Sequence, residues 1–359
     1  MKKRVVFTVL GSLLWLSCGN NHDMMYRPEY QYPSYTKDMQ VPTGERGETF
    51  KEIKENPFVE VSSQPVSTFS VDVDRAAYSN IRRMIQQGTL PPKDAVRIEE
   101  MINYFDYDYP TPDAQTPSPL RVSYEQAPAP WNTTHYLLRI GLKTKPLDLS
   151  NTPASHLVFL IDVSGSMMDY NKLPLLKSSL KLLLQNLKPQ DKVSIVTYAS
   201  GTQVALEPTS VREREKIEKV LDGLEAGGAT SGEQGIQLAY EQAHKAFIKG
   251  GNNRIILATD GDFNVGINNP NDLKAFIEKQ REGGVYLSVL GFGMGNYRDD
   301  MSETLADSGN GNYAYIDNLT EAKKVLVNEF GGTLFTVAKD VKLQVEFNPK
   351  SVSYTHLRA

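Results

Sequence analysis

Three oxygen-bearing side chains directly follow one apolar run. Asp162, Ser164 and Ser166 stand at alternate positions after the stretch Leu157–Ile161. A short run without polar residues is typical of a strand buried on both faces, as in a parallel sheet. Hard cations such as Mg²⁺ prefer oxygen ligands in octahedral geometry and keep several waters. One carboxylate and two hydroxyls on a single loop therefore predict a divalent-cation site.

Two later segments can complete such a site. Gly227-Gly228-Ala229-Thr230 is a glycine-rich turn that carries a hydroxyl, and Ile255–Thr259 is a second apolar run that leads into Asp260. Loops at the carboxyl ends of neighbouring parallel strands meet at one edge of the sheet, where open α/β folds bind ligands. The alternative is that Asp162 caps the next helix and that the serines satisfy turn amides.

The three segments together resemble the metal-ion-dependent adhesion site of the von Willebrand factor type A domain. That pattern is D-x-S-x-S, a threonine after a glycine pair, and an aspartate in a T-D-G turn. All five positions match: Asp162, Ser164, Ser166, Thr230 and Asp260. The resemblance implies a doubly wound, Rossmann-like sheet with strand order 3-2-1-4-5-6. It also implies Mg²⁺ or Mn²⁺ held directly by the hydroxyls and partly through waters by the carboxylates.

Other chemistries fit the sequence less well. Asp260-Gly261-Asp262-Phe263-Asn264 begins like a calcium loop, but Val265 replaces the required glycine and Asn271 the bidentate glutamate. We expect Asp262 and Asn264 to be turn residues near the metal. The sequence lacks a G-x-S-x-G elbow around Ser164 or Ser166 and a dinucleotide fingerprint after the first strand. A net charge of −4 with no basic stripe argues against nucleic acid.

The amino-terminal segment predicts export. Met1-Lys2-Lys3-Arg4 is basic, Val5–Leu16 is apolar, and small residues precede Cys18, the only cysteine of the 359 residues. This pattern is too short for a membrane span and indicates a secretory signal. It resembles a bacterial lipoprotein signal, although Trp15 stands where that motif usually has leucine. The resemblance implies that Cys18 is lipidated and that the protein is anchored in the bacterial cell envelope, outside the cytoplasm. An ordinary cleaved signal is the alternative.

Patterning divides the remaining chain into four parts. We expect a flexible tether at residues 19–56 and a small α+β domain at 57–150. The type A domain should span 153–335, and a truncated β-rich region should start at 336–359.

In the small domain we expect Asp72 or Asp74 to cap a helix that ends near Gly88. A second helix should begin at Pro91-Pro92 and carry its apolar side chains on one face. The residues expected on that face are Ala95, Ile98, Ile102 and Phe105. The segments 69–74 and 90–100 resemble the amino-terminal region of bacterial lipoproteins that carry a type A domain.

These features predict a membrane-anchored, Mg²⁺-dependent protein-binding module rather than an enzyme. Its open coordination position would take an Asp or Glu side chain from a partner protein. The alternative is a structural scaffold of an envelope complex in which the metal only stabilises loops. Hydrolysis would need a general base near the ion, and the motif loops offer only the two carboxylates that hold it.

Overall fold

The computed structural model describes residues 47–71, 73–113, 118–230, 232–261, 270–329, 332, 334–338 and 341–355. The predicted signal with Cys18, residues 19–46 of the predicted tether, Asp72, Asp262 and Asn264 lie outside the described residues. So does the tail 356–359. Within the described ranges, no helix is long and apolar enough to cross a membrane.

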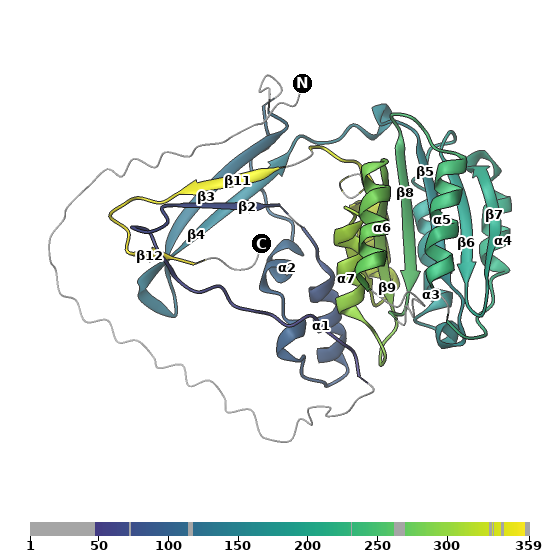
Figure 1. Ribbon diagram of the computed structural model, residues 1–359, viewed down its shortest axis with the longest axis horizontal. Coiled ribbons are helices and arrows are strands. Elements are labelled where there is room, and N and C mark those ends of the chain that lie inside the picture. Colours follow the sequence, from purple (N-terminus) through teal and green to yellow (C-terminus); the bar gives the residue numbers. More distant parts are fainter. Residues whose placement is uncertain are drawn as a thin grey trace.

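A six-stranded sheet forms the centre of the larger part of the molecule (Figure 1). Its strand order is β7-β6-β5-β8-β9-β10, and every neighbouring pair is parallel except β6 and β7. In chain order this is 3-2-1-4-5-6, so the predicted doubly wound fold is confirmed. The strands are β5 (Ser155–Asp162), β6 (Lys192–Tyr198), β7 (Thr202–Ser210), β8 (Asn252–Thr259), β9 (Val285–Phe292) and β10 (Tyr313–Ile316).

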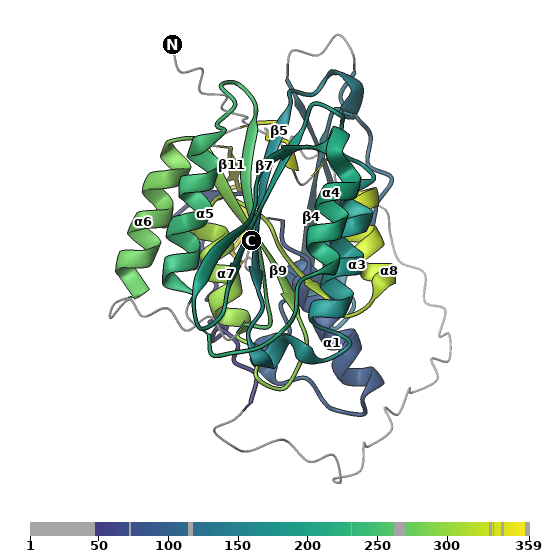
Figure 2. The same cartoon turned by 90° about the vertical axis from the view of Figure 1, so that its right-hand side faces the viewer.

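Helices cover both faces of this sheet, as Figure 2 shows. One layer holds α3 (Leu173–Leu184), α4 (Arg214–Asp222) and α8 (Leu319–Lys323), which runs into a π-helix at Lys324–Asn328. The other layer holds α5 (Glu233–Lys245), α6 (Pro270–Glu282) and α7 (Asp299–Ser308). Alternate residues of β5 join the two cores: Phe159 packs with the first layer and Leu160 with the second. Burial on both faces is why the stretch Leu157–Ile161 of this strand is apolar throughout.

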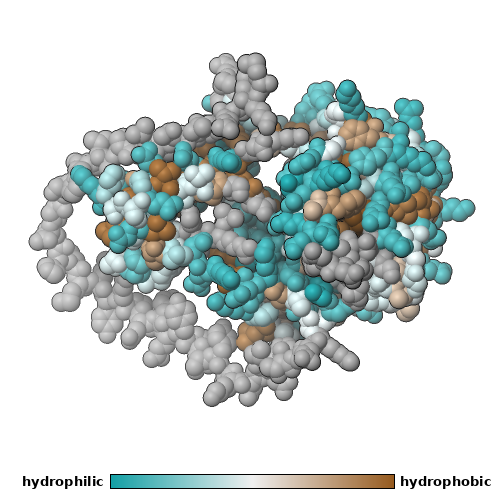
Figure 3. All heavy atoms as spheres, viewed as in Figure 1, coloured by the Kyte–Doolittle hydropathy of each residue, from teal (hydrophilic) through white to brown (hydrophobic). Residues whose placement is uncertain are grey.

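The smaller part of the molecule combines segments that precede the sheet domain in the sequence with segments that follow it. It contains β1 (Val59–Glu60), β2 (Val66–Ser70), α1 (Ala76–Gln86), a 3₁₀ turn at Lys93–Ala95, α2 (Ile98–Asn103), β3 (Leu120–Ala129), β4 (Asn132–Thr144), β11 (Lys342–Glu346) and β12 (Ser353–Tyr354). β2 pairs with β11 and β1 with β12, both antiparallel, while β3 and β4 form a hairpin. Strands that precede the large sheet in the sequence therefore pair with strands that follow it. Hydrophobic side chains lie among polar ones on this part (Figure 3), and on the hairpin Trp131 is 74% exposed.

Helix α1 covers the outer edge of β10. The Asp74 carboxylate accepts a hydrogen bond from the Tyr313 backbone N–H at 2.9 Å, and the Ser79 hydroxyl donates to the Tyr315 carbonyl at 2.7 Å. Side chains thereby satisfy backbone groups that a further strand would otherwise pair. The predicted capping role of Asp74 is wrong, because its carboxylate faces β10. The residue at the N-cap of α1 is Arg75, which makes no side-chain capping bond.

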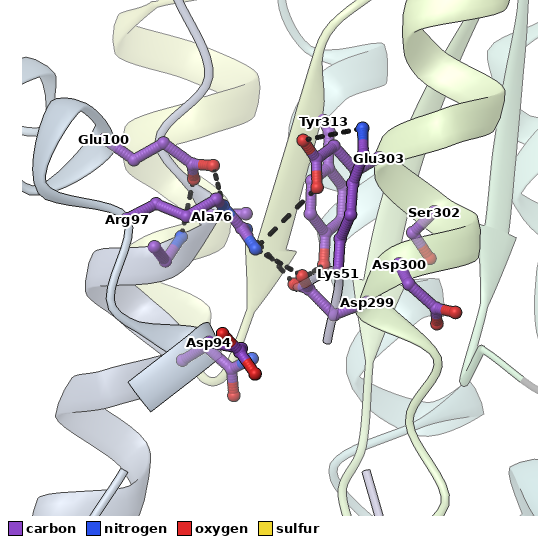
Figure 4. A network of polar contacts seen from close by, with 12 residues as sticks. Lys51, Ala76, Asp94, Arg97, Glu100, Asp299, Asp300, Ser302, Glu303 and Tyr313 are labelled. Carbon is purple, nitrogen blue, oxygen red and sulfur yellow. Dashed lines mark hydrogen bonds and ion pairs between the residues drawn. The ribbon is translucent and has the colours of Figure 1, made fainter. Parts of the chain in front are cut away.

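A buried polar network joins the small part to α7 (Figure 4). Arg97 forms ion pairs with Asp299 of the large domain and with Glu100 of α2, and all three side chains are buried. Burial alone would lower the pKa of Arg97, but the two carboxylates outweigh that effect and raise it. The guanidinium therefore stays charged within the interface.

The network also explains a wrong prediction. Instead of one helix from Pro91, the chain forms a 3₁₀ turn and then α2. Ala95 is buried, but Ile98, Ile102 and Phe105 are 48%, 44% and 49% exposed. The reason is that Arg97 and Glu100, rather than the apolar side chains, face inward to reach Asp299 and the Ala77 backbone N–H.

Candidate metal site

The loop after β5 brings its three predicted ligands together. Asp162 is fully buried, and its Oδ1 accepts a hydrogen bond from the Ser164 backbone N–H at 2.8 Å. The Ser164 and Ser166 hydroxyls lie 3.0 Å apart. A buried carboxylate and two hydroxyls therefore converge within one short turn.

The glycine-rich loop lies directly against this turn. The Gly227 N–H donates to the Val163 carbonyl at 2.8 Å, and the Gly165 N–H donates to the Gly228 carbonyl at 3.0 Å. These two bonds place the half-buried Thr230 a short way along the same loop. Gly228 has φ +83°, and a Cβ there would lie 2.5 Å from the Ser200 hydroxyl, so glycine is required.

Ser200 is a supporting residue that the sequence did not reveal. Its hydroxyl accepts a hydrogen bond from the Ala229 N–H at 2.8 Å, one residue before Thr230. It follows β6 in an ordinary turn, and no motif marks it. Its role is to fix the loop that carries the threonine.

Asp260 approaches from the neighbouring strand. It follows the last residue of β8, is fully buried, and lies near enough to Asp162 for the two charges to interact. Thr259 connects the two strands, since its hydroxyl donates to Asp162 Oδ2 at 3.4 Å and accepts from the Gly261 N–H at 3.0 Å. The structure thus brings residues from β5, β8 and two loops to the predicted edge of the sheet.

The electrostatics favour a bound cation. The pKa of Asp162 is raised to about 6: burial is the largest cause and the nearby Asp260 adds to it, while the Ser164 hydrogen bonds oppose both. Removing two carboxylates from water is costly unless a positive charge compensates them. A divalent ion would supply that charge.

One positive charge already lies at the site. Lys172 Nζ lies 2.9 Å from Asp260 Oδ2, and the residue is only 4% exposed. Its aliphatic stem passes over Gly293, where a Cβ would lie 2.3 Å from Lys172 Cε. No sequence pattern predicts this contact, because a lysine just before a helix is usually solvated.

Residues of β10 and of the amino-terminal segment form hydrogen bonds with the loop that contains Gly293. The Tyr315 hydroxyl donates to the Gly293 carbonyl, and Glu48 accepts from the Gly295 N–H at 2.9 Å while pairing with Arg83. Thr49 forms a parallel β-bridge with Arg298 further along this loop. The segment 293–298 therefore connects the small part of the molecule to the candidate site.

The donor set suits a hard cation held largely by hydroxyls and water. Among the described residues, no group of three or more His, Cys, Asp or Glu side chains could hold a metal. This excludes a carboxylate-rich calcium cage from that part of the chain. Mg²⁺ or Mn²⁺ is a better match for a set of two carboxylates, the Ser164 and Ser166 hydroxyls and a nearby threonine.

His156 lies away from this site. Its side chain forms a hydrogen bond with Ser194 at 2.9 Å, as expected for a structural histidine.

Comparison with known families agrees with this geometry. The model of the von Willebrand factor type A domain matches residues 156–328, which span the six-stranded sheet and the five candidate ligands. Residues 156–328 form a von Willebrand factor type A (VWA) domain. A model described as von Willebrand factor matches residues 44–139, and one described as the C-terminal part of the uncharacterized protein YfbK matches residues 332–357.

Relatives of this chain include two bacterial proteins whose names call them uncharacterized. YfbK of Escherichia coli (strain K12) is 50% identical over 309 residues, which are 85% of this chain and 54% of that protein. Protein sll0103 of Synechocystis is 29% identical over 193 residues, 53% of this chain and 44% of that protein. The chain thus spans about half the length of these relatives.

A solved von Willebrand factor type A structure from Catenulispora acidiphila is 17% identical with a TM-score of 0.44. The match covers 62% of this chain and 51% of that one.

Proposed function

We propose that the VWA domain is a divalent-cation-dependent protein-binding module. Asp162, Ser164, Ser166, Thr230 and Asp260 would hold Mg²⁺ or Mn²⁺ at the carboxyl edge of the sheet. The observation that carries this proposal is the convergence of two fully buried carboxylates from adjacent strands with the paired serine hydroxyls. Burying two carboxylates side by side is costly, and a divalent ion would compensate that cost.

The charge balance indicates how such an ion binds a partner. Two carboxylates neutralise a divalent ion but do not fill its six coordination positions. An open position can accept an Asp or Glu side chain from another protein. Desolvating that partner carboxylate is costly unless the ion compensates it, so binding should depend steeply on the metal.

Exposed apolar side chains beside the ligands favour a protein as the partner. Met168 and Tyr170 follow Ser166 within four residues and are 68% and 81% exposed. Met294, next to Gly293, is 40% exposed. Large apolar and aromatic side chains at a surface are typical of protein interfaces. We infer that the partner presents an acidic residue flanked by apolar ones.

The same proposal includes an anchor and a location. Cys18 would carry lipid and hold the protein at the bacterial cell envelope, outside the cytoplasm, with the VWA domain presented on a tether. Several acyl chains on one residue anchor a protein stably, unlike a single chain. We propose binding rather than catalysis, because the two carboxylates that could act as bases are those needed to hold the ion.

Calorimetric titration with Mg²⁺ tests the metal site. We expect one site in the wild-type protein and loss of binding in Asp162→Asn and in Asp260→Asn. Asp191→Asn is the matched control, because Asp191 is also buried, with 2% of its surface exposed. Its carboxylate accepts hydrogen bonds from the Ser155 and Lys188 backbone N–H groups, at the opposite edge of the sheet. Binding that survives both site substitutions would refute the ligand assignment.

Capture from envelope extract tests the partner. The mature protein should retain a protein in Mg²⁺ and release it in EDTA, and Asp162→Asn should not capture it. A set of captured proteins that is unchanged by EDTA and by Asp162→Asn would favour the scaffold function, with the metal as a loop stabiliser.

A further inference from the structure

The lysine at the candidate metal site occupies an unfavourable position. Lys172 is the N-cap residue of α3, where the helix dipole is positive, and it makes no capping bond. A positive charge at a helix amino terminus is destabilising, and lysine is rarely buried without a partner. The ion pair with Asp260 at 2.9 Å is the contact that compensates these costs.

The surrounding backbone is shaped to admit the lysine. Gly293 has φ +79°, and the Lys172 stem fills the space that any side chain there would need. The Tyr315 hydroxyl fixes the Gly293 carbonyl, so the wall beside the stem is held in place. The contact therefore depends on a loop from another strand as well as on the charge pair.

We propose that the Lys172 ammonium is an internal counter-ion that competes with the divalent cation for Asp260. The inference rests on the metal site of the proposed function and adds a residue that sets its affinity. When the site holds no metal, the ammonium neutralises Asp260. When a divalent ion binds, the ammonium must withdraw from Asp260 Oδ2 or remain close to a like charge, and both cost free energy.

This competition predicts a weak, concentration-sensitive metal site. The flexible four-carbon stem allows the ammonium to move without unfolding the loop. Metal-free protein would stay folded because the lysine replaces part of the missing charge. Occupancy would then follow the free Mg²⁺ concentration instead of being fixed when the protein folds.

Calorimetric titration of Lys172→Met with Mg²⁺ tests the proposal. We expect the dissociation constant to fall at least about tenfold relative to wild type, since a like charge is removed from the site. The metal-free melting temperature should fall as well, because Asp260 loses its counter-charge. Lys181→Met is the matched control: Lys181 of α3 pairs with Asp222 of α4 at 2.5 Å, but both side chains are partly exposed. It should leave Mg²⁺ affinity unchanged.

Each outcome has a distinct meaning. Unchanged or weaker Mg²⁺ binding in Lys172→Met would overturn the competition while leaving the metal site intact. If neither wild type nor Lys172→Met binds Mg²⁺, the metal site of the proposed function is refuted and the competition with it. Should Lys172→Met fail to fold, Lys172→Gln keeps a donor for Asp260 without the charge, and the same gain in affinity is expected.

Discussion

Asp74 lies beside the edge strand of the large sheet, with its Oδ1 2.9 Å from the backbone nitrogen of Tyr313. The two residues are 239 positions apart in sequence. Tyr313 is the first residue of β10, so this bond protects the strand edge where it begins. A carboxylate from the small part of the molecule thus completes the hydrogen bonding of the VWA sheet.

Replacing that carboxylate should loosen the edge. Asp74→Ala leaves the Tyr313 N–H buried without this acceptor, which should lower the free energy of unfolding by about 1–3 kcal/mol. Hydrogen exchange at β10 should accelerate, and mass spectrometry of the corresponding peptide measures it. Asp74→Asn keeps an acceptor oxygen and should stay near wild type. Equal exchange in all three proteins would contradict the role of this bond.

The pKa of Asp162 predicts an unusual pH dependence of the metal-free protein. Folding raises this pKa from 3.8 to about 6, so the folded carboxyl keeps a proton that the unfolded chain has released. The resulting stability is fully present below pH 3.8 and is lost as pH rises through about 6. The loss should be roughly 3 kcal/mol, since one pKa unit corresponds to about 1.4 kcal/mol.

Chemical denaturation in EDTA from pH 4 to pH 7 measures this loss. The difference between wild type and Asp162→Asn isolates the one carboxyl from all others. Saturating Mg²⁺ should reverse the slope, because the metal and the proton compete for the same oxygens. A difference that does not vary with pH would show that the pKa of Asp162 is not raised.

The buried ion pairs of Arg97 should contribute strongly to docking of the small part. Arg97→Met leaves Asp299 and Glu100 without their shared counter-charge, which should cost about 3–5 kcal/mol in the free energy of unfolding. Arg214→Met is the comparison, since Arg214 pairs with Glu218 at 2.6 Å on a solvent-facing turn of α4. That change should cost under about 0.5 kcal/mol. Similar losses in the two variants would mean that the Arg97 network adds nothing beyond a surface pair.

The proposed lipid anchor has a direct test. Cys18→Ala should abolish metabolic labelling with palmitate and move the protein from the membrane fraction to the soluble fraction. Ser17→Ala, which keeps the cysteine, should remain labelled. Labelling that persists in Cys18→Ala would refute lipidation at this residue.

The sheet and the loops of the candidate site could be predicted because local patterns encode them. Apolar runs such as Leu157–Ile161 identify strands buried on both faces, and residues just after such strands meet at one edge. The contact between Lys172 and Asp260 could not be predicted, because it joins residues 88 apart and uses a lysine where solvent is expected. The burial of Arg97 depends likewise on Asp299, 202 residues away, and it reversed the expected face of α2.

The segment 293–298 links the first described residues of the chain to the candidate metal site. Glu48 and Thr49 are the first residues of the described chain with a contact to the folded body, and both contact this segment: Glu48 through its side chain and Thr49 through its backbone. Lys172 packs against Gly293 in the same segment, and a Cβ on Gly261 would lie 2.2 Å from the Arg298 nitrogen. If the chain ahead of residue 47 is the proposed tether, a pull on it would reach the wall of the candidate metal site through these contacts. Under the proposed function, tension on that tether would be a second input to the site besides the concentration of the ion.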